Sequence, residues 1–245
     1  MDITASSIEV CFSPKLFKYI RTKGECIIVV TDVLRASTSI CSALHHGAIQ
    51  IRPVATLQEA MNLKEKGMLV AAERNGVKVD FADFGNSPYD FEGKKVKGKT
   101  IVYTTTNGTR AIEMAREHGT VAIGAFVNLQ ALSRWIIRQG KPVVMLCAGW
   151  KNQFNLEDSV FCGALTESLI QLGTYTVECD SAEAALDLWR VASQDILNYF
   201  EKASHRKRLS QLHADDVLEY AFKMNLTSVV PVLSGENIRD MSRIL

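Results

Sequence analysis

Short runs of apolar, mostly β-branched residues alternate along the chain with longer segments of mixed apolar and polar residues. The short runs predict strands at 26–31, 49–54, 69–72, 100–104, 121–124 and 143–147. The longer segments predict helices at 36–46, 56–65 and 109–117, then one capped by Asn128 and one from Asn155 to about residue 171. Thr56 is expected to cap the second of these helices.

This alternation predicts an α/β fold with three layers, in which helices cover both faces of a mostly parallel or mixed sheet. The strands lack strict polar alternation, as expected when both faces of a sheet are buried. Helical patterns at 182–202, 206–212 and 215–224 predict a helical C-terminal elaboration, with a last strand at 229–232. Because no linker rich in Pro, Gly or Ser interrupts the chain, we expect residues 1–245 to form a single domain.

Composition narrows the classes of function. Hydrophobic residues make up 47% of the chain, charged residues make up 22%, and the formal net charge is +1. No global field therefore attracts nucleic acid or an anionic membrane, and neither is expected as a partner. The N-terminus lacks a signal-peptide pattern, and no apolar run reaches the ~20 residues of a membrane span. Six scattered cysteines without a C-x-x-C pair indicate reduced thiols in a cytoplasmic protein. For a cytoplasmic protein of this size, base rates alone offer a homodimer as the expected oligomer.

One segment matches the residue pattern of a known motif but lacks the secondary structure that the motif requires. Residues 93–100, Gly-Lys-Lys-Val-Lys-Gly-Lys-Thr, satisfy the P-loop pattern. A P-loop must follow a strand and open a helix, so that helix and backbone amides surround the phosphates. Here the segment before it is a weak strand, and the β-branched segment after it predicts a strand. We therefore interpret 93–100 as a basic turn.

The first polar cluster follows the strand at 26–31. Asp32 stands at its tip, and Arg35 follows about one helical turn later. A carboxylate at a strand tip can bind Mg²⁺ or attack phosphorus, and a guanidinium can hold a phosphate through a planar fork of donors. The alternative is an Asp cap with a salt-bridged Arg. Asp32 and Arg35 are candidate catalytic residues.

The second cluster lies between the strand at 100–104 and the helix at 109–117. Gly108 lets the backbone turn so that successive amides point at one anion, and the helix N-terminus adds its dipole. The alternative, an Asn-Gly hairpin turn, requires a strand next, but the pattern that follows is helical. The cluster predicts a phosphate cradle with Arg110 as a catalytic cation, and its members are Thr105, Thr106, Asn107, Gly108 and Thr109.

A third cluster follows the strand at 143–147, where Ala and Gly permit close backbone approach. Two acids in the next helix are candidate Mg²⁺ ligands, although acids in a first turn commonly only offset the helix dipole. Two further segments beyond the strand at 69–72 are candidates for a pocket wall, with ordinary turn chemistry as the alternative. The residues are Cys147, Ala148, Gly149, Glu157, Asp158, Glu73, Arg74, Asn86 and Ser87.

Common phosphatase designs do not match. A cysteine phosphatase needs Arg six positions after its Cys, but Gln153 stands there after Cys147. A haloacid-type enzyme needs Asp-x-Asp, but position 34 is Leu. A histidine phosphatase would show Arg-His-Gly, and the chain has Glu-His-Gly at 117–119.

In their order, these clusters resemble the 2-phosphosulfolactate phosphatase family. The likeness spans about residues 9 to 233 and includes the weaker tail features His205, Arg208 and Asp216. Residues 150–153, Trp-Lys-Asn-Gln, and the helix at 182–202 depart from the family pattern. The matching motifs are Asp-Val-Leu-Arg-Ala at 32–36, Glu-Arg-Asn-Gly at 73–76, Gly-Asn-Ser-Pro at 85–88, Thr-Thr-Thr-Asn-Gly-Thr-Arg at 104–110, Cys-Ala-Gly at 147–149 and Leu-Glu-Asp at 156–158.

The resemblance implies a Mg²⁺-dependent phosphatase that acts on a small anionic phosphate ester, 2-phosphosulfolactate, a step of coenzyme M synthesis in methanogens. Asp32 would be a metal ligand or the nucleophile, and Glu157, Asp158 and Glu73 would be further ligands. Arg35, Arg110 and the amides of the second cluster would hold the phosphoryl group. The sulfonate would need other donors, for which the candidates are Arg74, Asn86, Ser87 and His205.

Two other classes of function remain open on these residues. A phosphoryl or nucleotidyl transferase can use the same cradle, and a non-catalytic anion-binding protein would result if the carboxylates were only caps.

Overall fold

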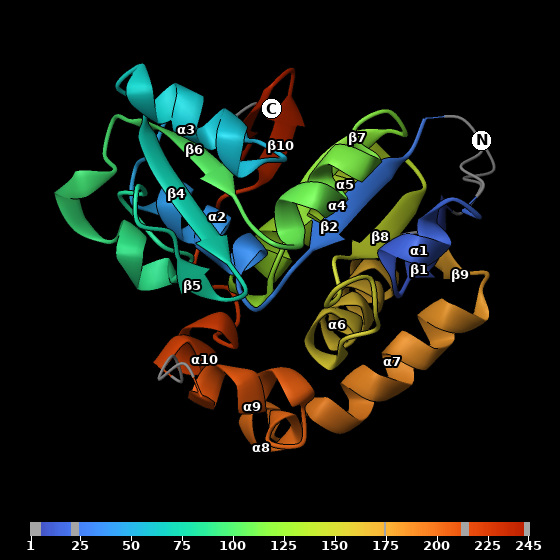
Figure 1. Ribbon diagram of the computed structural model, residues 1–245. Coiled ribbons are helices and arrows are strands. Elements are labelled where there is room, and N and C mark those ends of the chain that lie inside the picture. The colour runs from blue at the N-terminus through green and yellow to red at the C-terminus, as the bar shows by residue number, and fades with distance from the viewer. Residues whose placement is uncertain (1–5, 21–24, 174, 212–215, 243–245) are drawn as a thin grey trace.

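The computed structural model describes residues 6–20, 25–173, 175–211 and 216–242, and its strands form one sheet (Figure 1). The strand order is β5-β4-β6-β3-β11-β10-β7-β2-β8-β1-β9. The strands are β1 Ser6–Cys11, β2 Ile27–Thr31, β3 Gln50–Pro53, β4 Leu69–Arg74, β5 Val77–Lys78, β6 Thr100–Thr104, β7 Thr120–Gly124, β8 Val143–Cys147, β9 Tyr175–Val177, β10 Pro231–Ser234 and β11 Asn237–Asp240.

The sheet is mixed: a hairpin joins two parallel parts, and the short edge strand β5 runs antiparallel to β4. β4, β6 and β3 are parallel to one another, as are β7, β2, β8, β1 and β9. Between these parts lies the antiparallel hairpin β10–β11, which pairs with β7 on one side and β3 on the other. The predicted α/β class with a mostly parallel or mixed sheet is confirmed.

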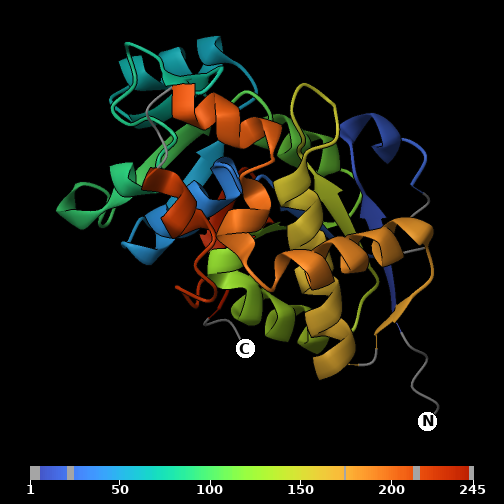
Figure 2. The ribbon, with the colours of Figure 1, turned by 90° about the horizontal axis from the view of Figure 1, so that it is seen from below.

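Helices cover both faces of the sheet. α5, α6 and α7 lie on one face of β2, β8 and β1, and α2 and α4 lie on the other. The helices are α1 Pro14–Phe17, α2 Ala36–His45, α3 Leu57–Glu65, α4 Gly108–Ala115, α5 Leu129–Gln139, α6 Leu156–Leu172, α7 Asp180–Ala192, α8 Ile196–Phe200, α9 Ser204–Gln211 and α10 Asp216–Ala221, with short 3₁₀ turns η1 Pro88–Phe91, η2 Gly93–Lys95 and η3 Phe126–Asn128. α7 to α10 follow one another across the lower side of the molecule and lie nearest the viewer when it is seen from below (Figures 1 and 2).

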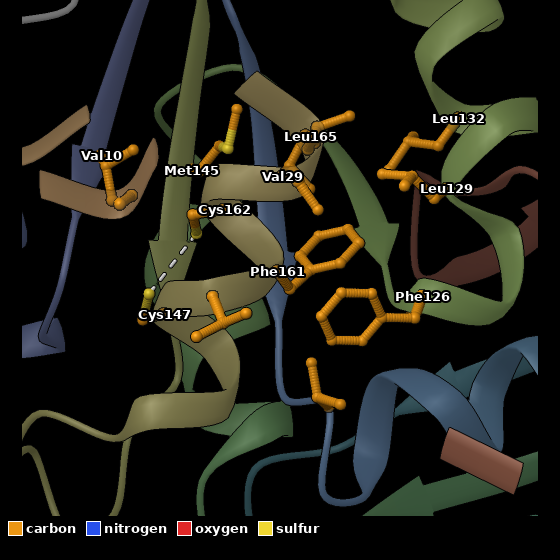
Figure 3. Close-up of a cluster of buried hydrophobic side chains, with 14 of the residues drawn as sticks. Val10, Val29, Phe126, Leu129, Leu132, Met145, Cys147, Phe161, Cys162 and Leu165 are labelled. Carbon is orange, nitrogen blue, oxygen red and sulfur yellow. Dashed lines mark hydrogen bonds between the residues drawn. The ribbon is translucent and has the colours of Figure 1, made fainter. Parts of the chain in front are cut away.

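Residues 27–30 of strand β2 are continuously apolar because both faces of the strand are buried. Ile27 and Val29 point into the core shared with α5 and α6, and Ile28 and Val30 point into the core shared with α2 and α4. A strand buried on both faces favours apolar side chains at successive positions, and Thr31 at the end of β2 is its one polar residue. In the first core, Phe161 of α6 packs edge-to-face on Phe126, with ring centroids 5.4 Å apart (Figure 3).

Several predicted elements need correction. The helix predicted at 182–202 is two helices, because the chain turns after α7 and the Asp195 side chain accepts a hydrogen bond from the Asn198 amide to begin α8. β1, β5, β9 and β11 were not predicted from the sequence. Thr56 caps α3 as expected. Asn128 and Asn155 occupy N-cap positions, but neither side chain caps its helix. Residues 212–215 of the predicted tail helices lie outside the described residues.

The P-loop match at 93–100 proves to be a turn. Its first residues form η2, and its last residue begins strand β6 rather than a helix. No helix in the described ranges is long and apolar enough to span a bilayer.

Candidate active site

A pocket of about 210 Å³ opens where the carboxyl ends of β2, β4 and β6 approach α9. Such strand ends are the usual ligand-binding edge of an α/β sheet. In Figure 1, β2 and β4 converge toward this edge, above α9. We call this cavity the strand-end pocket; it is lined by Asp32, Leu34, Arg35, Glu73, Asn75, Gly76, Asn86, Asn107, Trp150, His205, Arg208, Leu209 and Gln211.

Asp32 lies at the centre of the predicted first cluster. Its amide donates to Ser37 Oγ at 2.9 Å, and its carbonyl accepts from the Ser37 amide at 2.8 Å, which ties the end of β2 to the first turn of α2. A Cβ on Gly108 would stand 2.8 Å from Asp32 Oδ2 and 2.5 Å from the Ala36 side chain. Only glycine therefore lets the N-terminus of α4 approach this carboxyl group.

The Asp32 carboxyl is 7% exposed. Burial raises its pKa to about 6, and the negative charges of Glu73 and Glu157 act in the same direction, against the opposing effects of His205 and the Ala36 amide. No basic side chain donates a hydrogen bond to it within the part of the chain that the structure describes. A buried carboxyl group held in this way gains most from a bound cation.

Arg35 shares the pocket with Asp32, as predicted. Its side chain is 8% exposed, and Nη2 donates to the Gly76 carbonyl at 2.7 Å, which links the turn after β2 to the turn after β4. A guanidinium has five donors, so this bond leaves most of them for a ligand.

Glu73 joins two of the predicted clusters. Its Oε1 accepts from the Thr106 amide at 2.6 Å, and its Oε2 accepts from the Gly76 amide at 2.6 Å and from Thr106 Oγ1 at 3.2 Å. Although Glu73 lines the pocket, its carboxylate also holds the loops after β4 and β6 together.

The second cluster is held largely by its own hydrogen bonds. The Thr105 amide donates to Thr109 Oγ1 at 3.1 Å, and the Thr109 amide donates to Thr105 Oγ1 at 3.2 Å. With the Thr106 amide on Glu73, three amides of the predicted cradle have partners within the protein. Asn107 lines the pocket, and Gly108 lies against Asp32.

Arg110 does not line the strand-end pocket. Its exposed side chain lines another surface hollow, of about 790 Å³, together with residues of α1 such as Lys15 and Phe17. Arg110 is the third residue of α4, and the helix directs it away from Asp32.

In the third cluster, the Asp158 side chain links two loops by accepting hydrogen bonds from both. Its Oδ1 accepts from the Val33 amide at 2.8 Å, and its Oδ2 accepts from the Gly149 amide at 3.1 Å. The carboxyl group is fully buried, and burial together with the charge of Asp32 raises its pKa well above the usual value. Cys147 and Ala148 are buried and do not line the pocket. Cys147 Sγ lies 3.6 Å from Cys162 Sγ of α6 (Figure 3).

His205 lines the pocket and pairs with Glu157, whereas the predicted metal ligands Glu157 and Asp158 do not themselves line it. His205 Nδ1 lies 2.5 Å from Glu157 Oε1, which also accepts from Asn155 Nδ2 at 3.2 Å. Burial alone would raise the pKa of Glu157, but the hydrogen bond and charge of His205 lower it below its usual value. Because Nδ1 is taken by Glu157, Nε2 is the ring nitrogen available to a ligand.

Of the remaining predicted residues, one lines the pocket and two do not. Asn86 lines the pocket and accepts a hydrogen bond from the Tyr103 hydroxyl. Arg74 donates to the Glu73 carbonyl at 2.6 Å and to Thr104 Oγ1 at 2.9 Å, and it does not line the pocket. Ser87 precedes η1 and is likewise not part of the lining.

Sequence reasoning missed part of one wall. Arg208 and Trp150 appeared only as a weak family feature and as a departure from the family pattern, and Leu209 and Gln211 were not singled out. All four line the pocket. Helical spacing would have placed 205, 208 and 209 on one face of α9, but no sequence signal shows that this face covers the strand ends.

The residues that line the pocket fit a Mg²⁺ ion whose ligands include a phosphate ester. They fit less well an ion that is held by protein side chains alone. No group of three or more His, Cys, Asp or Glu side chains has metal-binding geometry among the described residues. Mg²⁺ is commonly held by one or two carboxylates, with water and substrate phosphate completing its shell. Asp32, which is buried and accepts no hydrogen bond from a basic side chain in the described ranges, fits the first of these, and Glu73 offers the second.

Comparison with known proteins agrees with the motifs. The family model described as 2-phosphosulpholactate phosphatase matches residues 11–236. A relative from Carboxydothermus hydrogenoformans is 37% identical over 243 residues, covering 97% of this chain and 98% of its own. One from Thermotoga maritima is 36% identical over 207 residues, covering 84% and 88% respectively. Both bear the name probable 2-phosphosulfolactate phosphatase. This chain belongs to the 2-phosphosulpholactate phosphatase family.

Proposed function

We propose that this protein is a Mg²⁺-dependent phosphatase that hydrolyses 2-phosphosulfolactate to sulfolactate and phosphate, in the cytoplasm and in a pathway to coenzyme M. Family membership confirms the predicted enzyme class, a phosphoric monoester hydrolase. The observation that carries the proposal is the buried carboxyl of Asp32, which faces a pocket beside Arg35 and the N-termini of α2 and α4. The six cysteines are all free thiols, which supports the cytoplasmic assignment.

Asp32 and Glu73 are the residues that would hold Mg²⁺. When bound, the ion would neutralise charge on the phosphoryl oxygens and orient the ester. Arg35 would bind phosphoryl oxygens with the donors that Gly76 leaves free. The helix N-termini at Asp32 add positive potential where the phosphate would sit.

Hydrolysis breaks the ester P–O bond, places the oxygen of water on phosphorus and gives a proton to the leaving alkoxide. His205 lines the pocket and is held by Glu157 through Nδ1, so Nε2 can supply that proton. The Glu157 carboxylate accepts the Nδ1 proton, so Nε2 donates a proton from the doubly protonated imidazolium, whose positive charge the carboxylate stabilises.

The test of this function is phosphate release from 2-phosphosulfolactate and from a generic aryl phosphate, with Mg²⁺ and with a chelator. We expect release that needs Mg²⁺. Undiminished release in the chelator contradicts the metal assignment. ATP consumption that depends on an acceptor points to a transferase instead. A phosphate-induced rise in melting temperature without hydrolysis points to an anion-binding protein.

A separate measurement distinguishes the two roles of Asp32. Mg²⁺ binding to the protein without substrate is followed by calorimetry for the wild type and for Asp32→Asn. Loss of binding in the variant assigns Asp32 as a ligand, and retained binding with lost hydrolysis assigns it as the nucleophile.

The homodimer expected from base rates is a separate proposal. Light scattering during size-exclusion chromatography tests it.

A further inference from the structure

Helix α9 forms the wall of the strand-end pocket opposite the strand ends. Its residues His205, Arg208 and Leu209 line the cavity and lie on one face, because positions three and four apart are neighbours on a helix. This wall comes from the helical C-terminal region, whereas the carboxylates and Arg35 come from strand ends. The pocket therefore has two sides of different origin.

Arg208 is the arginine of this wall. Its guanidinium carbon lies 4.5 Å from the ring centroid of Trp150, and Nη1 donates to Ser204 Oγ at 3.3 Å. Nε is buried and has no hydrogen-bond partner among the residues that the structure describes. Arg208 forms no ion pair within the described ranges, where Glu157, the nearby carboxylate, is bonded to His205 instead.

The Nε of Arg208, without a hydrogen-bond partner in the described ranges, raises the free energy of the site unless a ligand accepts its hydrogen bond. A buried donor without a partner loses its hydration and gains nothing in return. The Trp150 ring lies against the guanidinium group, and a planar fork of N–H groups matches a carboxylate or sulfonate. Trp150 is itself set by a tight turn, in which a Cβ on Gly149 would stand 2.2 Å from the Gln153 carbonyl.

We propose that Arg208, supported by Trp150, binds a second oxyanion of the substrate, other than the phosphate, and is the specificity-determining residue of the site. The inference rests on the proposed function for the placement of the phosphate at Asp32 and Arg35. A substrate with two separated anionic groups would then span the pocket from the strand ends to α9. The second oxyanion is a carboxylate or a sulfonate, and the experiment separates these.

The experiment measures kcat/KM for wild type, Arg208→Gln and Trp150→Leu with three esters. 2-Phosphosulfolactate carries carboxylate and sulfonate, 2-phospholactate carries only the carboxylate, and an aryl phosphate carries neither. The control variant is Lys207→Gln, which removes the same charge from an exposed position of the same helix. We expect Arg208→Gln to lose about tenfold or more with 2-phosphosulfolactate, and to stay within about twofold of wild type with the aryl phosphate.

The pattern across substrates identifies the group. If 2-phospholactate suffers the same loss, Arg208 binds the carboxylate; if it is unaffected, Arg208 binds the sulfonate. We expect Trp150→Leu to show the same substrate order with a smaller loss, and Lys207→Gln to resemble wild type. Equal losses with all three esters, or none with any, overturn the proposal.

A binding measurement keeps the inference separate from the proposed function. Sulfolactate and lactate are titrated into wild type and Arg208→Gln by calorimetry. If wild type hydrolyses none of the esters but binds sulfolactate, and Arg208→Gln weakens that binding about tenfold or more, the proposed function fails and the anion site stands. Equal affinity in the two proteins, or no binding by wild type, overturns the anion site whatever the hydrolysis assay shows.

Discussion

Asp32 is both buried and able to carry a negative charge, and these two properties conflict in the metal-free protein. Its carboxyl is buried at the meeting point of β2, α2 and α4, and burial raises its pKa to about 6, so its charge destabilises the fold near neutral pH. The same charge is what a cation or a phosphoryl group would require. Functional sites commonly retain such unfavourable groups, because removing them removes the activity.

We therefore expect Asp32→Asn to lower kcat about a hundredfold or more while raising the melting temperature of the metal-free protein. The carboxyl has a reference pKa of 3.8 and a raised pKa in the folded state. Below the reference value it is neutral in both states, and as pH rises through the folded value the wild type loses stability that the neutral amide keeps. Scanning calorimetry at about pH 4 and about pH 8 should show the gain only at the higher pH.

Glu117→Gln is the control for this prediction, because it makes the same kind of change at an exposed position. It should alter neither kcat nor the pH dependence of the melting temperature. An Asp32→Asn protein less stable than wild type at the higher pH contradicts the assignment of a raised pKa.

Arg35 and Arg110 allow a second comparison at the residue scale. Both are predicted catalytic residues, but only Arg35 lines the strand-end pocket. We expect Arg35→Gln to reduce kcat/KM about a hundredfold or more, and Arg110→Gln to stay within about fivefold of wild type. Similar large losses in both variants would show that α4 presents Arg110 to the substrate in the working enzyme.

At the scale of elements, the placement of Glu157 and Asp158 depends on the packing of α6 between the sheet and α7. Gly163 lies where α6 crosses α7, and a Cβ there would stand 2.0 Å from the Ala185 carbonyl oxygen. The obstacle is the backbone of α7, which cannot move aside as a flexible side chain can. The close crossing keeps α7 against α6 and directs the chain toward α8 and α9.

Gly163→Ala tests this contact, because two effects oppose each other. Alanine favours a helix over glycine by about 1 kcal/mol, but forcing an atom into a packed interface costs about 1–3 kcal/mol or more. We expect a net loss of unfolding free energy, measured by urea denaturation. Gln171→Ala, at an exposed position of the same helix, should change stability little. Unchanged or increased stability of Gly163→Ala would show that α6 and α7 separate easily.

At the scale of the whole molecule, the C-terminal hairpin joins the two parallel parts of the sheet. β10 pairs with β7 through Val232 and Ala122, and β11 pairs with β3 through Ile238 and Ile51. Val230, Val232 and Ile238 are buried in the two main cores. A segment from the end of the sequence thus completes the middle of the sheet.

Truncation after Thr227 should therefore prevent cooperative folding, since it removes two central strands and leaves unpaired edges on both parallel parts. Circular dichroism and thermal unfolding would show loss of the transition. Truncation after Ser242 retains the hairpin and should fold with one transition, as the predicted single domain requires. Two separate transitions in the longer protein would contradict that domain prediction.

The sequence by itself determined the alternation of strands and helices, because burial of both sheet faces forces continuous apolar strands and helices must cover them. It also located Asp32, Arg35, Glu73, Asn107 and His205, since polar residues after apolar strands are conspicuous and the order of the motifs resembled a known family. These inferences need only local pattern and the chain's order.

Only the tertiary structure decided which of the candidate residues share a pocket. Arg110 stands two residues from Gly108, yet the turn of α4 sends it to another surface. Asp158 follows Glu157, yet it braces two loops while Glu157 holds His205. The insertion of β10–β11 and the closure of α9 over the strand ends depend on contacts between residues far apart in the chain. Such contacts leave no periodic signal, because they are selected by the packing of whole elements rather than by neighbouring residues.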